Sequence, residues 1–326
     1  MNLGILGAGG IAGTMANTVN MMNKAGAGDV HLYAVGSRDL KKAQKFAAVN
    51  GVENAFGSYE EMLSDPALDL VYVATPHSHH MEHTKMCIMH GKAALVEKAF
   101  TANAAQAGEV LSLAEEKHVL VTEAIWPRYQ PMRQMINETL ASGIVGEPRT
   151  LTANLSYSIS HVPRIQEPAL AGGALLDVGV YVLNFAEMVF GRCDRAVGCA
   201  QMTDKGVDAT DGLTLFWNDG RTAVLTAGTD CMSDRKGIIY CTKGFVIVEN
   251  INNPQSLAVY DENYQCISRT DAPAQLTGYE YEVLEAAQAL KDGKIECASM
   301  PHEETIHVME LMDALRAQMG VKYPFE

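Results

Sequence analysis

A glycine-rich turn near the N-terminus constrains the fold of this chain more than any other feature. Residues 3–6 read as a short buried strand, and Gly7-Ala8-Gly9-Gly10-Ile11-Ala12 follows at once. Gly7 permits a tight turn, Gly9 lets the backbone approach a pyrophosphate, and a small Ala12 allows close packing of helix on strand. The start of the helix adds positive potential. This context favours a dinucleotide site over a plain glycine turn, with the candidate residues Gly7, Gly9, Gly10, Ile11 and Ala12.

Strand and helix patterns alternate along the rest of the first half. Apolar runs at residues 30–37, 70–74, 93–96 and 119–122 read as strands, and helical stretches separate them. The continuous run at 70–74 is typical of a parallel strand that is buried on both faces. The alternation predicts an α/β fold with a doubly wound parallel sheet in a first domain of residues 1–123.

The pattern changes in the second half. Turn signals at Asn218-Asp219-Gly220 and Thr242-Lys243-Gly244 separate strand-like runs, and residues 257–260 and 265–269 form a third pair. Such spacing is typical of hairpins. A chain of 326 residues also exceeds the usual size of one hydrophobic core. We therefore expect a second, α+β domain, residues 124–326, built on a large and mostly antiparallel sheet.

Composition and charge argue against several classes of function. The 25 Lys and Arg residues against 39 Asp and Glu give a net charge of -14, which is unlike a nucleic-acid-binding protein. The seven cysteines are scattered and lack a Cys-x-x-Cys motif, so neither a disulfide framework nor a zinc site is expected. No apolar run approaches the roughly 20 residues of a membrane span, and no signal peptide precedes the first strand. We expect a cytoplasmic protein without a membrane partner.

The turn after the second strand bears on which dinucleotide binds. NAD-specific sites usually place an acidic residue there, whereas this chain has Ser37 and Arg38, followed by Asp39. An arginine and a hydroxyl suit a 2′-phosphate, so NADP is favoured as the cofactor. The alternative is that Ser37 only caps the following helix and Asp39 holds the ribose of NAD.

The strand at residues 93–96 ends in Glu97 and Lys98, which is an unusual position for a charged pair. Ligands of open α/β sheets bind beyond the carboxyl ends of the strands. Burial and neighbours can shift a lysine there into a proton-transfer role. A surface lysine that closes a strand is the alternative interpretation.

A polar stripe interrupts the apolar helix that we predict over residues 172–184. Asp177, Tyr181 and Asn184 follow the i, i+4, i+7 spacing of one helix face. Bare burial of such groups costs a few kcal/mol each, so the stripe needs partners. It either belongs to an internal hydrogen-bond network or faces a cleft and meets Lys98.

The histidines at 77, 79, 80 and 83 invite a metal interpretation, since His79 and His83 are one helical turn apart. Nearby Asp or Cys ligands are missing, so no metal is expected. We expect a polar loop over the cofactor, with His80 starting the next helix.

These motifs together resemble the glucose–fructose oxidoreductase / inositol dehydrogenase (Gfo/Idh/MocA) family, and within it the branch of dimeric trans-1,2-dihydrobenzene-1,2-diol dehydrogenases. The resemblance covers nearly the whole chain. It rests on Gly7-x-Gly9-x-x-Ala12, Ser37-Arg38, Ala74-Thr75-Pro76 with His80, Glu97-Lys98, Glu123-Ala124-Ile125-Trp126 with Arg128, Gly172-Gly173-Ala174-Leu175-Leu176-Asp177-x-Gly179-x-Tyr181, and Gly320-Val321-x-Tyr323-Pro324.

The resemblance implies a Rossmann domain followed by a sheet domain that carries substrate and oligomer contacts. It implies hydride transfer between NADP, or NAD, and a polyol, diol or sugar, with homodimerisation through the C-terminal sheet. Lys98 matches the family's essential lysine, Tyr181 the acid/base residue of this branch, and Asp177 its acidic partner. The remaining expected cofactor contacts are Thr75, Pro76, His80, Glu97, Trp126 and Arg128.

One departure from the family pattern is Ala99, where a proline usually follows the lysine. Loss of the proline frees the backbone dihedral, so the lysine amine is less firmly placed. Trp126 and Arg128 have simple packing as an alternative role. A regulator that holds a dinucleotide without chemistry and an NAD-dependent glycosidase of the same family remain as alternative functions.

Overall fold

The chain forms two units, each built from more than one stretch of sequence. The structure is a computed structural model that describes residues 1–326. The first unit comprises Met1–Trp126 and Gln275–Ile306, and the second comprises Pro127–Ala274 and His307–Glu326.

The first unit is built on a six-stranded parallel sheet with the strand order β3-β2-β1-β4-β5-β6. Its strands are β1 (Asn2–Leu6), β2 (His31–Gly36), β3 (Asn54–Phe56), β4 (Leu70–Val73), β5 (Ala93–Glu97) and β6 (Val121–Ala124). Its helices are α1 (Gly10–Ala25), α2 (Leu40–Asn50), α3 (Tyr59–Leu63), α4 (His77–Met89), α5 (Ala104–Lys117) and α9 (Glu280–Lys291). The strand order reverses beside β1, and ligands bind at such a switch point. The predicted doubly wound parallel sheet is confirmed.

Local sequence signals set most of the helix ends in this unit. Ser58 Oγ accepts a hydrogen bond from the Glu61 N–H over 3.1 Å and so caps α3. Gly51, at φ 71°, ends α2 in the left-handed conformation that favours glycine. One predicted start was wrong: α4 begins at His77 rather than His80, because Pro76 already occupies the N-cap position.

The helix α9 corrects the expected second domain of residues 124–326. It follows the C-terminal sheet in sequence, yet it packs against α1 and β5 of the first unit. Just before it, Thr277 Oγ1 lies 2.8 Å from Thr18 Oγ1 on α1. An amphipathic pattern does not specify which sheet a helix will cover, so this return could not be predicted from the sequence.

The second unit contains an eight-stranded sheet with the strand order β14-β13-β12-β11-β7-β10-β9-β8. Its strands are β7 (Pro148–Ser156), β8 (Arg195–Met202), β9 (Asp208–Phe216), β10 (Thr222–Gly228), β11 (Gly237–Cys241), β12 (Gly244–Glu249), β13 (Ser256–Asp261) and β14 (Cys266–Asp271). All neighbouring strands are antiparallel except β7 and β10. The predicted antiparallel sheet and its three hairpins are confirmed.

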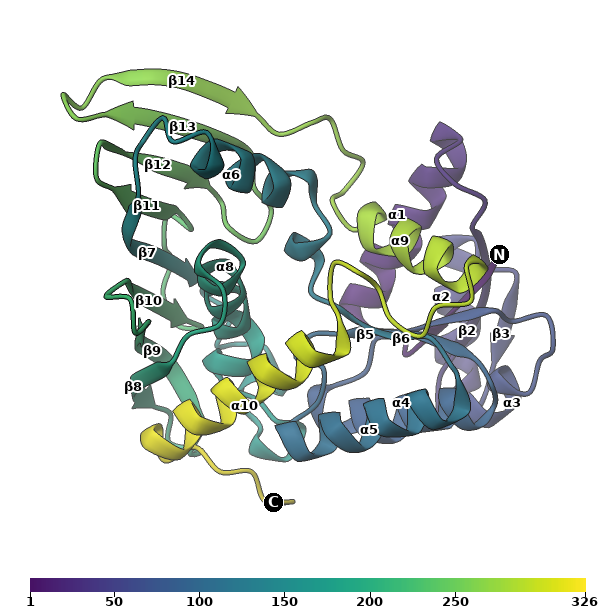
Figure 1. Cartoon of the computed structure of the whole chain (residues 1–326). Coiled ribbons are helices and arrows are strands. Elements are labelled where there is room, and N and C mark those ends of the chain that lie inside the picture. Colours follow the sequence, from purple (N-terminus) through teal and green to yellow (C-terminus); the bar gives the residue numbers. More distant parts are fainter. The chain divides into compact units, whose positions relative to one another are not determined.

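Helices cover one face of this sheet. In Figure 1, α6 (Pro131–Ala141) and α8 (Val180–Phe190) lie on the same side of the strands, and α8 packs on β7 and β10. Alternate residues such as Leu151, Leu213 and Leu225 are buried beneath the helices. On the opposite face Val197 and Val224 are 45% and 49% exposed. This unit therefore has one covered and one open sheet face.

The predicted helix over residues 172–184 differs in its first turn. Leu175–Gly179 is a π-helical turn, and α8 continues from it. The stretch Pro168–Phe190 is long and apolar enough to span a membrane by length and composition, contrary to our reading of the sequence. Its most apolar window is 89% buried inside the fold, which is the pattern of a core helix.

Candidate active site

The glycine turn of the first unit leaves an open space at the start of α1. Gly7 has φ 107°, and a Cβ atom there would lie 2.8 Å from the carbonyl oxygen of Ala74. Gly9 is the N-cap of α1 and offers no capping side chain, and a Cβ on Gly9 or Gly10 would meet nothing within 4 Å. Ala12 is fully buried against the sheet. Open space in front of bare backbone N–H groups fits a pyrophosphate.

The turn after β2 has a free cation and an engaged carboxylate. Asp39 caps α2, because its Oδ1 accepts hydrogen bonds from Lys41 N at 2.9 Å and Lys42 N at 3.3 Å. The alternative in which Ser37 caps the helix is therefore wrong. Ser37 Oγ instead accepts a hydrogen bond from the Asp39 N–H. Arg38 is exposed and forms no hydrogen bond or ion pair within the chain.

Arg38 borders a hollow of about 370 Å³ in the first unit, lined also by Tyr59, His79 and His83. His83 Nδ1 lies 3.0 Å from Thr75 Oγ1, and its ring meets the Tyr59 ring edge-on with centroids 4.8 Å apart. Burial lowers the pKa of His83 to about 4, so the ring is neutral at pH 7. No group of three or more His, Cys, Asp or Glu side chains is placed to hold a metal ion. Sequence patterns did not identify these side chains as neighbours of Arg38.

His80 connects the segments that follow β4 and β5. It is fully buried, with Nδ1 2.9 Å from the Ala99 carbonyl oxygen and Nε2 2.7 Å from the Thr75 carbonyl oxygen. Burial, opposed by these hydrogen bonds, lowers the pKa of His80 to about 4, and the nearby charge of Lys98 acts in the same direction. The Lys98–Ala99 peptide is cis. The structure thus brings Thr75, His80 and Lys98 together at the carboxyl ends of β4 and β5.

Glu97, the last residue of β5, is only 6% exposed and accepts a hydrogen bond from the Tyr72 hydroxyl. Glu282 on α9 is fully buried, and neither of its carboxyl oxygens has a hydrogen-bond partner. Burial, together with the charge of Glu97, raises the pKa of Glu282 well above its ordinary value. The sequence did not indicate this neighbour of Glu97. A contact between Glu97 and the cofactor stays a prediction.

Trp126 and Arg128 are both largely buried. Within the first unit, the Trp126 ring stacks on Tyr279 with centroids 4.1 Å apart and planes 3° from parallel. Within the second unit, Arg128 is 3% exposed, and its Nε donates to Asn184 Oδ1 over 2.5 Å. Trp126 therefore has a packing role, and Arg128 has a hydrogen-bonding role. Binding of cofactor by either residue stays a prediction.

The polar stripe of the second unit has partners at both ends. The Arg164 NH1 group donates to Asp177 Oδ1 over 2.9 Å, and Asp177 is 3% exposed. Asn184 accepts from Arg128 and also donates to the Val180 carbonyl oxygen over 2.8 Å. Tyr181 lies between them and is 8% exposed. Asp177 and Asn184 thus each have hydrogen-bond partners within the second unit, and the expected meeting of Tyr181 with Lys98 stays a prediction.

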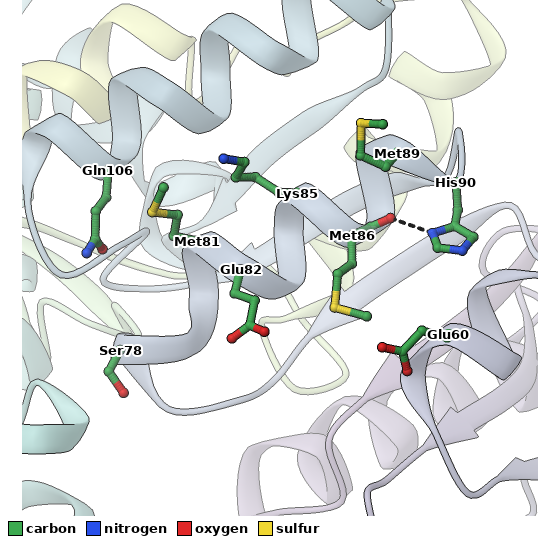
Figure 2. A pocket seen from close by; sticks show the side chains of 9 residues that line it. All are labelled: Glu60, Ser78, Met81, Glu82, Lys85, Met86, Met89, His90 and Gln106. Atoms are coloured by element: carbon green, nitrogen blue, oxygen red, sulfur yellow. Dashed lines mark hydrogen bonds between the residues drawn. The ribbon is translucent and has the colours of Figure 1, made fainter. Parts of the chain in front are cut away.

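A second hollow of the first unit, of about 570 Å³, runs along α4 (Figure 2). Figure 2 shows the side chains of Met81, Lys85 and Met89 on α4, with Gln106 of α5 beside Met81. No residue that we predicted to bind cofactor or substrate lines it.

Comparison with known proteins identifies the family. Residues 1–125 match an oxidoreductase family with an NAD-binding Rossmann fold, and residues 133–247 match the Gfo/Idh/MocA C-terminal domain. A trans-1,2-dihydrobenzene-1,2-diol dehydrogenase from Xenopus tropicalis is 33% identical, over 91% of this chain and 92% of its own length. This chain belongs to the Gfo/Idh/MocA oxidoreductase family. The mouse enzyme of the same name is 29% identical over 98% of this Gfo/Idh/MocA chain and 97% of its own length.

Solved structures share the fold of this Gfo/Idh/MocA oxidoreductase. A 3-ketoreductase from Actinomadura kijaniata, crystallised with NADP and TDP-benzene, superposes with a TM-score of 0.88 at 22% identity, covering 98% of both chains. An aldose-aldose oxidoreductase from Caulobacter crescentus gives a TM-score of 0.85 at 19% identity, covering 98% of this chain and 97% of its own. The predictions of family, fold class, oxidoreductase function and a nicotinamide dinucleotide cofactor are confirmed.

Proposed function

We propose that this oxidoreductase is an NADP-dependent dehydrogenase that oxidises a secondary hydroxyl of a diol, polyol or sugar. The observation that carries the choice of NADP is the turn after β2. Arg38 is exposed and has no hydrogen-bond or ion-pair partner, whereas the Asp39 carboxylate caps α2. An unpaired guanidinium suits a 2′-phosphate, and an acidic residue free to accept from ribose hydroxyls is missing from the turn.

In this proposal the first unit holds the cofactor. Gly9, Gly10 and the N–H groups at the start of α1, including that of Ile11, bind the pyrophosphate, while Ser37 and Arg38 bind the 2′-phosphate. The segment that contains Thr75 and Pro76 lies beside Gly7. A Cβ atom added at Gly7 would lie 3.4 Å from the Thr75 side chain. When bound, the nicotinamide supplies the acceptor for the substrate hydride.

The proton chemistry belongs to Tyr181 and Lys98 in this proposal. Tyr181 takes the proton of the substrate hydroxyl, and the positive charge of Lys98 stabilises the phenolate that forms. The two residues can also exchange roles. Asp177, held by Arg164, orients the acid/base group or binds a second substrate hydroxyl.

The names of the relatives support this class of substrate. The amphibian and mouse relatives are named for a dihydrodiol, and the structural relatives are named as a ketoreductase and an aldose oxidoreductase. All of these names describe interconversion of a C–OH group and a carbonyl. We place a vicinal diol or an aldose first among candidate substrates.

We also propose that two copies associate through the open face of the C-terminal sheet. Val197, Val224 and Tyr240 are 45%, 49% and 40% exposed, and each lies on a strand of that sheet. No helix of the second unit covers this face (Figure 1). An uncovered sheet face with apolar side chains is typical of a protein–protein interface.

A substrate panel tests the enzymatic proposal. Wild type, Lys98→Met and Tyr181→Phe are each incubated with trans-dihydrodiols, aldoses and polyols, with NADP or NAD, and reduced nicotinamide is followed by absorbance. We expect turnover with NADP by wild type and a loss of kcat of at least about 100-fold in both variants, while NADP binding persists.

Full turnover by either variant would contradict its assigned role. Cofactor binding without turnover on any substrate would support the silent regulator. Glycoside hydrolysis with retained cofactor and no net reduction would support the glycosidase.

A further inference from the structure

A buried carboxylate that the proposed mechanism does not use holds the start of the helix that carries Tyr181. Asp208, the first residue of β9, is 1% exposed, and its Oδ2 accepts a hydrogen bond from the Leu175 N–H over 2.5 Å. Leu175 begins the π-helical turn Leu175–Gly179. N–H groups in the first turn of a helix have no partner within the helix, so the carboxylate supplies one.

The π-helical turn determines where Asp177 and Tyr181 lie on the helix. The Val180 N–H bonds to the Leu175 carbonyl oxygen, five residues back, instead of the four of an α-helix. Asp177 lies inside this wide turn, and Tyr181 is the second residue after it. The turn therefore rotates Asp177 relative to Tyr181 away from the spacing of a regular helix. π-bulges of this kind occur frequently at functional sites.

The residues before the turn are packed around Asp208. A Cβ on Gly173 would lie 2.1 Å from Asp208 Oδ1, so only glycine leaves room for the carboxylate. A Cβ on Gly172 would lie 2.5 Å from the Ile165 carbonyl oxygen. The Tyr323 hydroxyl donates to the Gly172 carbonyl oxygen over 2.9 Å, which fixes the same segment from the C-terminal end of the chain.

Asp211 lies beside Asp208 and provides a matched comparison. It is fully buried, and burial, together with the charge of Asp208, raises its pKa to about 9. Asp211 is therefore protonated at neutral pH and electrically resembles an asparagine. No hydrogen bond joins Asp211 to the π-helical turn. Asp208 alone of the pair contacts Leu175.

We propose that Asp208 is a positioning residue for the acid/base helix: by accepting the Leu175 N–H, it holds the π-helical turn in the register that presents Asp177 and Tyr181 to the substrate. This inference rests on the proposed role of Tyr181. Asp208 itself does not touch substrate or cofactor. Its effect passes through the backbone of residues 175–181.

The test compares Asp208→Ala, Asp208→Asn and Asp211→Asn with wild type. We expect Asp208→Ala to lower kcat by about 10- to 100-fold, as a misplaced catalytic group does, while the Kd for NADP stays within about twofold. Asp208→Asn keeps an oxygen acceptor but loses the negative charge that strengthens the hydrogen bond from Leu175, so it should lose less kcat than Asp208→Ala while still loosening the turn. Asp211→Asn should keep wild-type kcat within about twofold. A wild-type kcat in folded Asp208→Ala would overturn the proposal.

Hydrogen exchange provides a readout that does not depend on activity. Backbone amides of residues 174–181 should exchange faster in Asp208→Asn than in wild type, with the strands β10 and β11 unchanged. Unchanged exchange in that segment would overturn the proposal even where Asp208→Ala fails to fold. Tyr181→Phe is measured alongside: full activity in Tyr181→Phe refutes the proposed function, whereas an inactive Tyr181→Phe beside a fully active Asp208→Ala refutes only the role of Asp208.

Discussion

The guanidinium of Arg164 donates to the Asp177 carboxylate over 2.9 Å, although the Arg164 side chain is 45% exposed and that of Asp177 only 5%. A half-exposed cation thus compensates a buried anion. Removal of one partner from such a pair leaves the other charge uncompensated, which costs more than the pair contributes.

Arg164→Ala should therefore impair both stability and turnover. We expect a lower melting temperature and a fall in kcat/KM for the alcohol of about 10-fold or more, because Asp177 loses the group that orients it. Arg164→Lys keeps the positive charge but lacks the planar guanidinium. Its melting temperature and kcat/KM should therefore lie between those of wild type and Arg164→Ala. The checks are thermal unfolding and steady-state kinetics at saturating NADP. Wild-type kcat/KM in Arg164→Ala would show that the orientation of Asp177 by Arg164 has no part in catalysis.

Arg38→Ala should change the coenzyme preference. A charge-assisted hydrogen bond contributes about 1.5–3 kcal/mol, so KM for NADP should rise by about 10- to 100-fold. KM for NAD should stay within about twofold, because NAD has no 2′-phosphate for Arg38 to bind. Lys45→Ala, on the helix α2 that follows the turn, removes an exposed charge away from Arg38 and is the control. Equal changes for both coenzymes in Arg38→Ala would refute the NADP assignment.

The pH dependence of stability should report the buried Asp211. Its pKa is raised to about 9 in the folded chain, whereas an aspartate in an unfolded chain has a pKa of about 4. Between these values the folded state keeps a proton that the unfolded state has lost. The free energy of unfolding contributed by this group is therefore fully present below about pH 4 and is lost as pH rises toward 9.

Asp211→Asn should remove that dependence. Urea unfolding at pH 5, 7 and 8.5 should show wild type losing stability relative to the variant as pH rises, by at most about 1.4 kcal/mol per pH unit. A constant difference between the two proteins across this range would show that Asp211 does not hold a proton in the folded state.

A single charged substitution tests whether two copies associate through the open sheet face. Val224→Glu places a carboxylate at the middle of β10 on the open face, where burial in an interface would be costly. We expect wild type to sediment as a dimer at micromolar concentration and Val224→Glu as a monomer. Val49→Glu, at a 76% exposed position on α2, is the matched control and should remain dimeric. A dimeric Val224→Glu would place the interface elsewhere.

The sequence by itself determined the features that depend on neighbouring residues. The Gly7–Ala12 turn, the β/α alternation and the hairpin at residues 218–220 each follow from backbone preferences and the spacing of apolar side chains over a few residues. The N-cap at Ser58 is of the same kind. These features were enough to predict the dinucleotide fold and the antiparallel sheet, because both are repeats of such local units.

Only the tertiary structure decided which distant groups meet. Leu175 and Asp208 are 33 residues apart, Gly172 and Tyr323 are 151 apart, and α9 returns to the first unit from beyond the second sheet. The regular helix spacing that we applied to Asp177 and Tyr181 also did not predict the π-helical turn at Leu175–Gly179. The physical reason is that periodicity records which side of an element is apolar. The groups that a buried carboxylate or amide finds there depend on how the elements pack.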